Sequence, residues 1–173
     1  MKINFFRIII FSFVIFFLLI FFLGLKKNSN YNTKNLIGSK ISSFLLPSIY
    51  SSDLISEEAL KQNQFTLINF FASWCAPCRQ EHKYLLKLNN QNKNIKILGI
   101  NFKDKKNNAL IFLNELGNPY NSVLEDPDGR ASVLFGIYGI PESILINKEL
   151  TIIKKIIGPI DKKQLEEILN LTL

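Results

Sequence analysis

The sequence predicts an α/β domain that follows one N-terminal membrane-spanning helix. Three observations lead to this prediction: an uncharged apolar run near the start, a polar segment after it, and short β-rich runs that alternate with helical patterns over the rest of the chain. With 173 residues, the chain has room for one ordinary domain. We therefore expect an anchor at residues 1–25, a linker at 26–40 and a domain at 41–173.

The anchor is predicted from the run between Ile8 and Leu25, which holds 18 residues without a charge. As a helix this run would span about 27 Å, close to the hydrocarbon thickness of a bilayer. A cleaved signal peptide is the competing interpretation. Its apolar core would normally be shorter and be followed by an A-x-A-like site, which is not found near Gly24. We therefore expect residues 8–25 to contact membrane lipid.

The net positive charge of the chain lies close to this apolar run. Lysine and arginine outnumber aspartate and glutamate by 21 to 14, yet the first acidic residue is Asp53 and six of the basic residues precede position 41. Without those six, 15 basic residues stand against 14 acidic ones. The domain is therefore nearly neutral, and the pattern indicates contact with anionic lipid and excludes nucleic-acid binding.

The first half of the domain alternates strands with helices. Phe65–Phe71 and Ile95–Phe102 are apolar, β-rich runs of the kind found in buried strands. A helix is expected after Cys75, reaching about Asn90, because a proline is tolerated in the first helical turn. A second helix is expected at 107–116, where a Gly-Asn-Pro sequence ends it.

The second half is predicted as a hairpin between two helices. A turn is expected at 125–129, a short helix at 131–135, strands at 143–146 and 151–157, and a final helix capped by Asp161. A parallel βαβ unit followed by a β-hairpin and a closing helix is the order of a thioredoxin fold, with a central mixed β-sheet flanked by helices.

The chemistry is predicted from the two cysteines of the chain, Cys75 and Cys78. A bridge between them closes too small a loop to be a useful structural staple. Cys75 is expected at a helix N-terminus, where unsatisfied N–H groups and the helix dipole favour the thiolate. Cys75 should therefore be the attacking sulfur, open to solvent, and the less exposed Cys78 should resolve the mixed disulfide. A buried strand and Trp74 before the pair, and Pro77 before the second cysteine, favour redox chemistry over a zinc half-site.

A metal site is the alternative, with Cys75, Cys78 and His82 as ligands and copper delivery as a non-enzymatic function. No second C-x-x-C and no further histidine completes a closed zinc site. We therefore expect neither a metal nor an organic cofactor, only a redox-active disulfide. His82 is then interpreted as a solvated or capping residue of its helix.

Three segments, NFFASWCAPCRQEHKYL, GINFKDKKNNALIFLNELGNPY and FGIYGIPESILIN, resemble the cytochrome c maturation family called CcmG or DsbE. The resemblance runs from about Leu36 to Ile160. It implies a protein disulfide reductase in the bacterial inner membrane that faces the periplasm and keeps apocytochrome c, or its thiol carrier, reduced for haem attachment. Electrons would come from a membrane reductant of the DsbD or CcdA type. A general periplasmic reductase of the TlpA or ResA kind is the enzymatic alternative.

The resemblance also implies roles for residues around the cysteine pair. Trp74 matches the flanking aromatic residue, and Pro141 matches the proline before the third strand that is cis in this fold. Glu81 and Glu142 match the acidic residues of the family's active site, although a carboxylate in an early helical turn is stabilised there whatever its function. Tyr138 is either part of the site or ordinary packing. In the same way Trp74 remains open to a core role and Pro141 to a turn.

The sequence departs from the related patterns at two places. Asn69 occupies the strand position where cytoplasmic thioredoxins have a buried aspartate that helps to move protons. That role therefore falls to Glu81, Glu142 or water. Ala76 and Pro77 stand between the cysteines in place of the Pro-Thr or Val-Pro pairs common among relatives.

Overall fold

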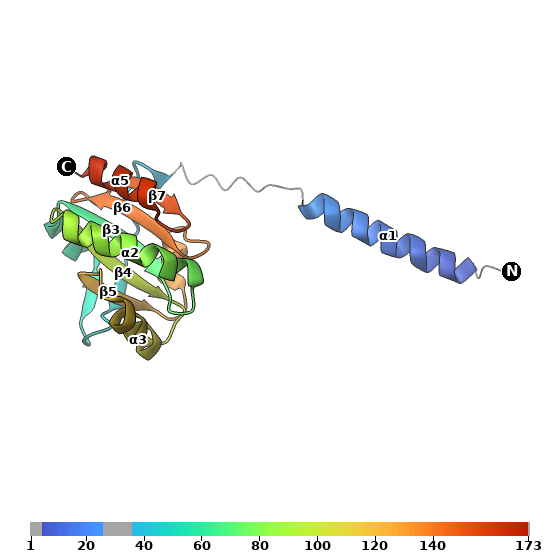
Figure 1. Cartoon of the computed structure of the whole chain (residues 1–173), viewed down its shortest axis with the longest axis horizontal. Coiled ribbons are helices and arrows are strands. Elements are labelled where there is room, and N and C mark those ends of the chain that lie inside the picture. Colours follow the sequence, from blue (N-terminus) through green and yellow to red (C-terminus); the bar gives the residue numbers. More distant parts are fainter. Residues whose placement is uncertain (1–4, 26–35, 173) are drawn as a thin grey trace. The chain divides into compact units, whose positions relative to one another are not determined.

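The computed structural model describes residues 5–25 and 36–172, which belong to two compact units, an N-terminal helix and a folded domain (Figure 1). The helix α1 (Phe5–Leu25) has 21 residues. Its part from Phe6 to Gly24 is long and apolar enough to cross a membrane. The predicted helix is thus confirmed. Residues 26–35 of the expected linker lie outside the described residues.

A five-stranded mixed sheet with the order β5-β4-β3-β6-β7 forms the centre of the domain. Its strands β3 (Phe65–Phe71), β4 (Ile95–Phe102) and β5 (Ser122–Asp126) run parallel to one another. Strand β6 (Glu142–Asn147) pairs antiparallel with β3, and β7 (Ile152–Ile157) pairs antiparallel with β6. This arrangement of a parallel half and a hairpin half confirms the predicted thioredoxin fold.

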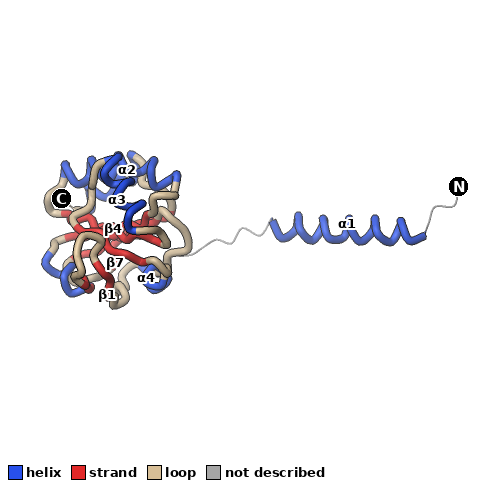
Figure 2. Tube along the Cα trace, turned by 90° about the horizontal axis from the view of Figure 1, so that it is seen from below, coloured by secondary structure: helices blue, strands red, loops and turns tan. Residues whose placement is uncertain are grey.

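Helices cover one face of the sheet, and mostly loops and short elements cover the other. The first face packs against α2 (Ala76–Gln91), α3 (Lys106–Leu116) and α5 (Lys162–Leu171) through buried aliphatic and aromatic side chains. The second face packs against residues 41–60 and the segment after α4 (Arg130–Leu134). Figure 2 shows α2 and α3 on one side of the strands and β1 and α4 on the other. Successive residues of β3 point to opposite faces, so Asn69 lies on the α2 side.

Several short elements were not predicted. Strands β1 (Leu45–Pro47) and β2 (Leu54–Ser56) form a small separate sheet, and the 3-10 helix η2 (Glu57–Gln62) follows them. Strands of three residues are too short to show a periodic pattern. Glu125 and Asp126, which the sequence assigns to a turn, belong to β5.

The strand β5 was missed because it ends in polar residues that have specific partners. The buried Asp126 side chain accepts hydrogen bonds from the backbone N–H groups of Ala131 (3.2 Å) and Ser132 (2.8 Å) at the start of α4. The turn therefore begins only at Pro127. The Asp-Pro-Asp-Gly sequence was interpreted correctly as a turn. Its first residue, Asp126, is however the last residue of β5, and its side chain binds the start of α4.

The beginning of the domain also differs from expectation. The backbone N–H of Gly38 donates to the Ile152 carbonyl at 2.9 Å, and Lys40 forms a β-bridge with Thr151. Residues 36–40 therefore belong to the folded domain, although the sequence assigns them to the linker. Their polar composition gives no sign of this backbone pairing.

Candidate active site

The two cysteines lie at the junction between the end of β3 and the start of α2. Cys75 is the N-cap residue of α2, and its Sγ accepts a hydrogen bond from the backbone N–H of Cys78 at 3.2 Å. The two form a disulfide with an S–S distance of 2.03 Å. The expected placement at a helix N-terminus is thus confirmed, and an otherwise unpaired helical N–H group points at the first sulfur.

The expectation that Cys75 is open to solvent is wrong for this disulfide form. Cys75 is 4% exposed and Cys78 is 1% exposed. Cys78 is thus the less exposed of the two, as predicted, but both are buried. Both belong to the core cluster that also contains Phe71 and Ala72. The strand β3, which leads to the two sulfurs, is itself buried after Phe65.

Trp74 lies beside the disulfide on the surface and is not a core aromatic residue. Its ring is 59% exposed, and its Nε1–H donates to the Lys103 carbonyl at 3.2 Å. The neighbouring Asp104 accepts a hydrogen bond from the Ser73 N–H at 2.8 Å. The loop between β4 and α3 therefore holds the segment just before Cys75. Asp104 was not predicted. The signal was its place at the carboxyl end of β4, next to β3 in a parallel sheet.

The loop before β6 carries a second group of predicted residues. The Ile140-Pro141 peptide bond is cis, as the resemblance implies. Ile140 packs against the cluster that contains both cysteines. Tyr138 is 73% exposed, so core packing does not explain its ring.

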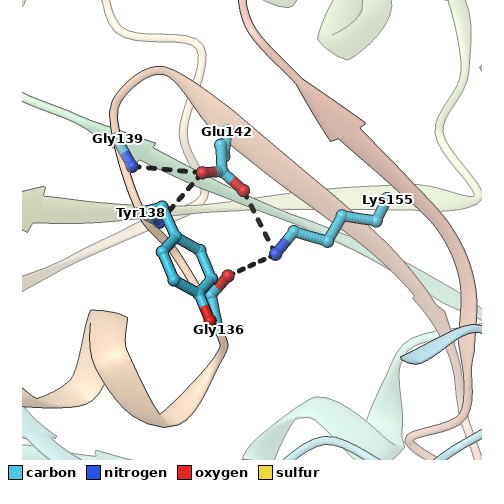
Figure 3. A network of polar contacts seen from close by, with 5 residues as sticks. All are labelled: Gly136, Tyr138, Gly139, Glu142 and Lys155. Atoms are coloured by element: carbon cyan, nitrogen blue, oxygen red, sulfur yellow. Dashed lines mark hydrogen bonds and ion pairs between the residues drawn. The ribbon is translucent and has the colours of Figure 1, made fainter. Parts of the chain in front are cut away.

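Glu142 contacts this loop through its carboxylate, as Figure 3 shows. Its Oε1 accepts hydrogen bonds from the N–H groups of Tyr138 (3.0 Å) and Gly139 (3.2 Å). Its Oε2 forms an ion pair at 3.1 Å with Lys155, whose ammonium also donates to the Gly136 carbonyl. The Lys155 and Glu142 side chains are only 1% and 3% exposed. Lys155, on β7, was not predicted, since nothing local in the sequence links it to this loop.

Glu81 is the other buried carboxylate, and its surroundings differ. It is 1% exposed, and it accepts hydrogen bonds from Asn69 Nδ2 at 2.9 Å and from the Ile160 N–H at 2.7 Å. Burial raises the pKa of Glu81 to about 7, and the two hydrogen bonds oppose this rise. Among the influences on the Glu81 carboxyl group, burial is the largest.

The two carboxylates do not form a pair. Ser143 is hydrogen-bonded to Asn69 at 3.0 Å and so lies on the α2 face of the sheet. The preceding residue, Glu142, points to the opposite face, where Lys155 meets it. The structure therefore brings Asn69 and Glu81 together on the α2 side of the sheet and bonds Glu142 to the loop of Tyr138 and Gly139.

His82 does not have the environment that either interpretation gave it. It is 2% exposed, its Nε2 is 2.8 Å from the Gly117 carbonyl oxygen, and its ring meets Phe112 edge to face. Burial lowers the pKa of His82. The solvated or capping interpretation is thus wrong. Within residues 5–25 and 36–172, no three His, Cys, Asp or Glu side chains gather as a metal site would require.

Comparisons with known proteins agree with this geometry. Residues 38–170 match the family described as Redoxin. The chain is 46% identical over 113 residues to the thiol:disulfide interchange protein CycY of Rhizobium leguminosarum bv. viciae, a match that covers 65% of this chain and 60% of that protein. It is 40% identical over 128 residues to the thiol:disulfide interchange protein DsbE of Pseudomonas aeruginosa, covering 74% and 70% of the two chains.

A solved structure is similar over nearly its whole length. The crystal structure of a putative thiol:disulfide interchange protein DsbE from Chlorobium tepidum superposes with a TM-score of 0.69 at 25% sequence identity. The superposition covers 79% of this chain and 96% of that chain.

Replacing Lys155 with Met should lower the free energy of unfolding by about 3–5 kcal/mol, because it leaves the Glu142 carboxylate buried without its cation. Urea denaturation followed by circular dichroism measures the change. Lys154→Met is the matched control, since Lys154 forms a more exposed pair with Glu167 and should lose less than about 1 kcal/mol. Equal losses in the two variants would contradict the importance given to the buried pair.

The raised pKa of Glu81 should make stability depend on pH. Its ordinary value is 4.5 and its folded value about 7, so the folded protein keeps a proton that the unfolded chain loses. The stabilising contribution of neutral Glu81 is complete below pH 4.5 and is lost as the pH rises to about 7. Over that interval the free energy of unfolding of the oxidised wild-type protein should fall by about 3 kcal/mol relative to that of Glu81→Gln. Parallel stability profiles of the two proteins would rule out a raised pKa.

Proposed function

The chain belongs to the Redoxin family and, within it, to the DsbE thiol:disulfide interchange proteins, and we propose that it is a membrane-anchored protein disulfide reductase of cytochrome c maturation. The observation that carries the proposal is the Cys75–Cys78 disulfide at the start of α2, with the Cys78 N–H directed at the Cys75 sulfur. An N–H donor at this position stabilises a thiolate on Cys75 when the pair is reduced.

The exchange proceeds in two steps. The Cys75 thiolate attacks one sulfur of a substrate disulfide, which forms a mixed disulfide and releases the other substrate sulfur as a thiolate. The Cys78 thiolate then attacks the Cys75 sulfur, so that the second substrate thiol leaves and the Cys75–Cys78 disulfide closes. Two electrons pass to the substrate, and a thiol reductant in the membrane, of the DsbD or CcdA type, returns two electrons to the pair. This chemistry requires no metal and no organic cofactor.

Cys78 must lose its proton before it attacks, and Glu81 is the residue placed to take it. Glu81 follows Cys78 by three positions on α2, so the two side chains lie on the same face of the helix. A group with a pKa of about 7 accepts and returns protons efficiently near neutral pH. Glu142 is less suited to the task because Lys155 and two backbone N–H groups hold its carboxylate. Asn69 carries no exchangeable acid proton.

The substrate docks along the exposed side of the disulfide. Trp74 and Tyr138 present their rings to solvent on the two loops that flank the site. The segment that carries Tyr138 and ends at Pro141 receives an extended peptide from the substrate, as in the addition of a strand to a sheet. The proposed substrate is apocytochrome c or its thiol carrier, whose cysteines are kept reduced for the attachment of haem.

The chemistry and α1 support the proposed location. The helix α1 is long and apolar enough to cross a membrane, which supports an anchor in the bacterial inner membrane. Disulfide substrates are found in the oxidising periplasm and are rare in the cytoplasm. We therefore place the domain on the periplasmic side, tethered by residues that follow α1.

Two single substitutions test the division of labour between the sulfurs. Cys78→Ser keeps the nucleophile but removes the group that resolves the mixed disulfide, so it should accumulate covalent complexes with its substrate. Cys75→Ser should accumulate none. Non-reducing gels and mass spectrometry of the trapped partner give the result, with the double substitution as the control for unspecific trapping.

The identity of the trapped protein tests the proposed pathway. A cytochrome c precursor or its thiol carrier supports the proposal, whereas a broad mixture of secreted proteins would favour a general reductase. Complexes with Cys75→Ser and none with Cys78→Ser would reverse the assignment of the nucleophile.

The mature protein should keep its N-terminus and sediment with the membranes, because α1 offers an apolar segment of spanning length. Fractionation with an alkaline wash, followed by N-terminal sequencing, measures this. A variant that lacks residues 1–25 is the control and should be soluble. Wild-type protein that begins near Lys26 and stays in the soluble fraction would disprove the anchor.

A further inference from the structure

A buried chain of hydrogen bonds leads from Tyr120 to Glu81. The Tyr120 hydroxyl donates to Asn69 Oδ1 at 2.7 Å, and Asn69 Nδ2 donates to Glu81 Oε1 at 2.9 Å. The same Nδ2 also donates to Ser143 Oγ at 3.0 Å. Tyr120 is 7% exposed, and the other three residues are 1% exposed or less. These side chains come from the segment after α3 and from β3, α2 and β6, so tertiary packing alone brings them together.

We propose that Tyr120 is a positioning residue for Glu81: its hydroxyl orients the Asn69 amide so that the NH2 group faces the Glu81 carboxylate and favours its ionised form. The inference rests on the proposed function, in which Glu81 takes the proton of Cys78. Tyr120 itself transfers no proton in this scheme, and it acts only through Asn69.

The direction of the hydrogen bonds carries the argument. An asparagine side chain has a donor end and an acceptor end of nearly the same size. With its NH2 group toward Glu81 it stabilises the carboxylate, whereas with its carbonyl toward Glu81 it would stabilise the protonated acid. The Tyr120 hydroxyl, by donating to Oδ1, aligns both bonds toward Glu81. Hydrogen bonds to a charged group are about twice as strong as those between neutral groups. Removing the Tyr120 hydroxyl therefore destabilises the ionised form of Glu81 more than its protonated form.

The balance at Glu81 makes this orientation matter. Burial raises the pKa of Glu81, and hydrogen bonds from two donors, the Ile160 N–H and the Asn69 amide, lower it. The cleft beside Glu81, about 300 Å³ in volume, is also lined by charged or titratable groups of α2 and of the residue before α5: Lys83, Tyr84 and Asp161. Cys78 shares the helix face of Glu81. Strands β3 and β6 present neutral Asn69 and Ser143 to this network.

Tyr120→Phe removes one oxygen and leaves the packing in place. The Tyr120 ring is stacked on Phe71 with 4.8 Å between centroids, and it lies against Gly99, where a Cβ would come within 3.0 Å of it. A phenylalanine ring keeps both contacts. Tyr50→Phe is the matched control, because the Tyr50 hydroxyl accepts a hydrogen bond from Asn118 Nδ2 at 2.9 Å, in the same segment as Tyr120.

The first measurement is the pKa of Glu81 in the oxidised full-length protein in lipid nanodiscs. Carboxyl ¹³C NMR of labelled glutamate gives the titration, and Glu81→Gln identifies the signal. Tyr120→Phe should raise the pKa of Glu81 by about half a unit, and Tyr50→Phe should leave it in place. Asn69→Leu, which removes the donor itself, should raise it further. An unchanged or lowered value in Tyr120→Phe, or the same rise in Tyr50→Phe, would overturn the proposal.

The second measurement is the pH dependence of exchange. Reduced protein is mixed with a synthetic peptide that contains one C-x-x-C disulfide, and release of the peptide thiols is followed in a single turnover. The profile of Tyr120→Phe should move to higher pH, with release about threefold slower near pH 6.5 and equal to wild type well above the pKa. A merely structural role would change the rate without moving the profile, and that result would contradict the proposal. A moved pKa with an unmoved profile would instead overturn the role given to Glu81 in the proposed function.

Discussion

The domain depends on one junction, the passage from the buried strand β3 into the N-terminus of α2 at Cys75. Because β3 is central in the sheet and its residues after Phe65 are almost fully buried, the first sulfur is held in place from below. Because Cys75 caps α2, the helical N–H of Cys78 points at that sulfur. The neighbouring loops take their positions from this junction: Asp104 bonds the backbone of Ser73, and Ile140 packs against the cluster of the two cysteines.

Two buried carboxylates serve this junction by different physics. Lys155 and two N–H groups compensate the charge of Glu142, so the carboxylate acts as a support for the loop of Tyr138. Glu81 meets only neutral donors, and burial therefore keeps its proton available near neutral pH. Removing one partner of a buried ion pair leaves the other charge unpaired and destabilises the protein. A buried acid without a cation beside it has a raised pKa instead, and such a pKa suits proton transfer. Glu142 therefore supports a loop, whereas Glu81 has the raised pKa that suits a proton-transfer group.

The sequence predicted the elements that carry strong local patterns. The bounds of β3 and β4 agree with the apolar runs, and the capping of α5 by Asp161 agrees with its side-chain bond to the Gln164 N–H. Features that depend on distant partners were missed. Lys155 meets Glu142 across the β6–β7 pair, and Tyr120 reaches Asn69 from 51 positions away. His82 was misjudged because a polar residue in a helix gives no local sign of being buried.

Asn69 stands at the strand position where cytoplasmic thioredoxins have a buried aspartate. This amide simplifies the titration of the site. Two carboxyl groups in one buried network titrate together, and their apparent pKa values belong to the pair. An amide in place of one of them cannot be ionised, yet it has both a donor and an acceptor to keep the network satisfied. In this protein Asn69 is bonded to Tyr120, Ser143 and Glu81 at once. Glu81 is then the one carboxyl group among these four side chains, so one carboxyl proton titrates within this network.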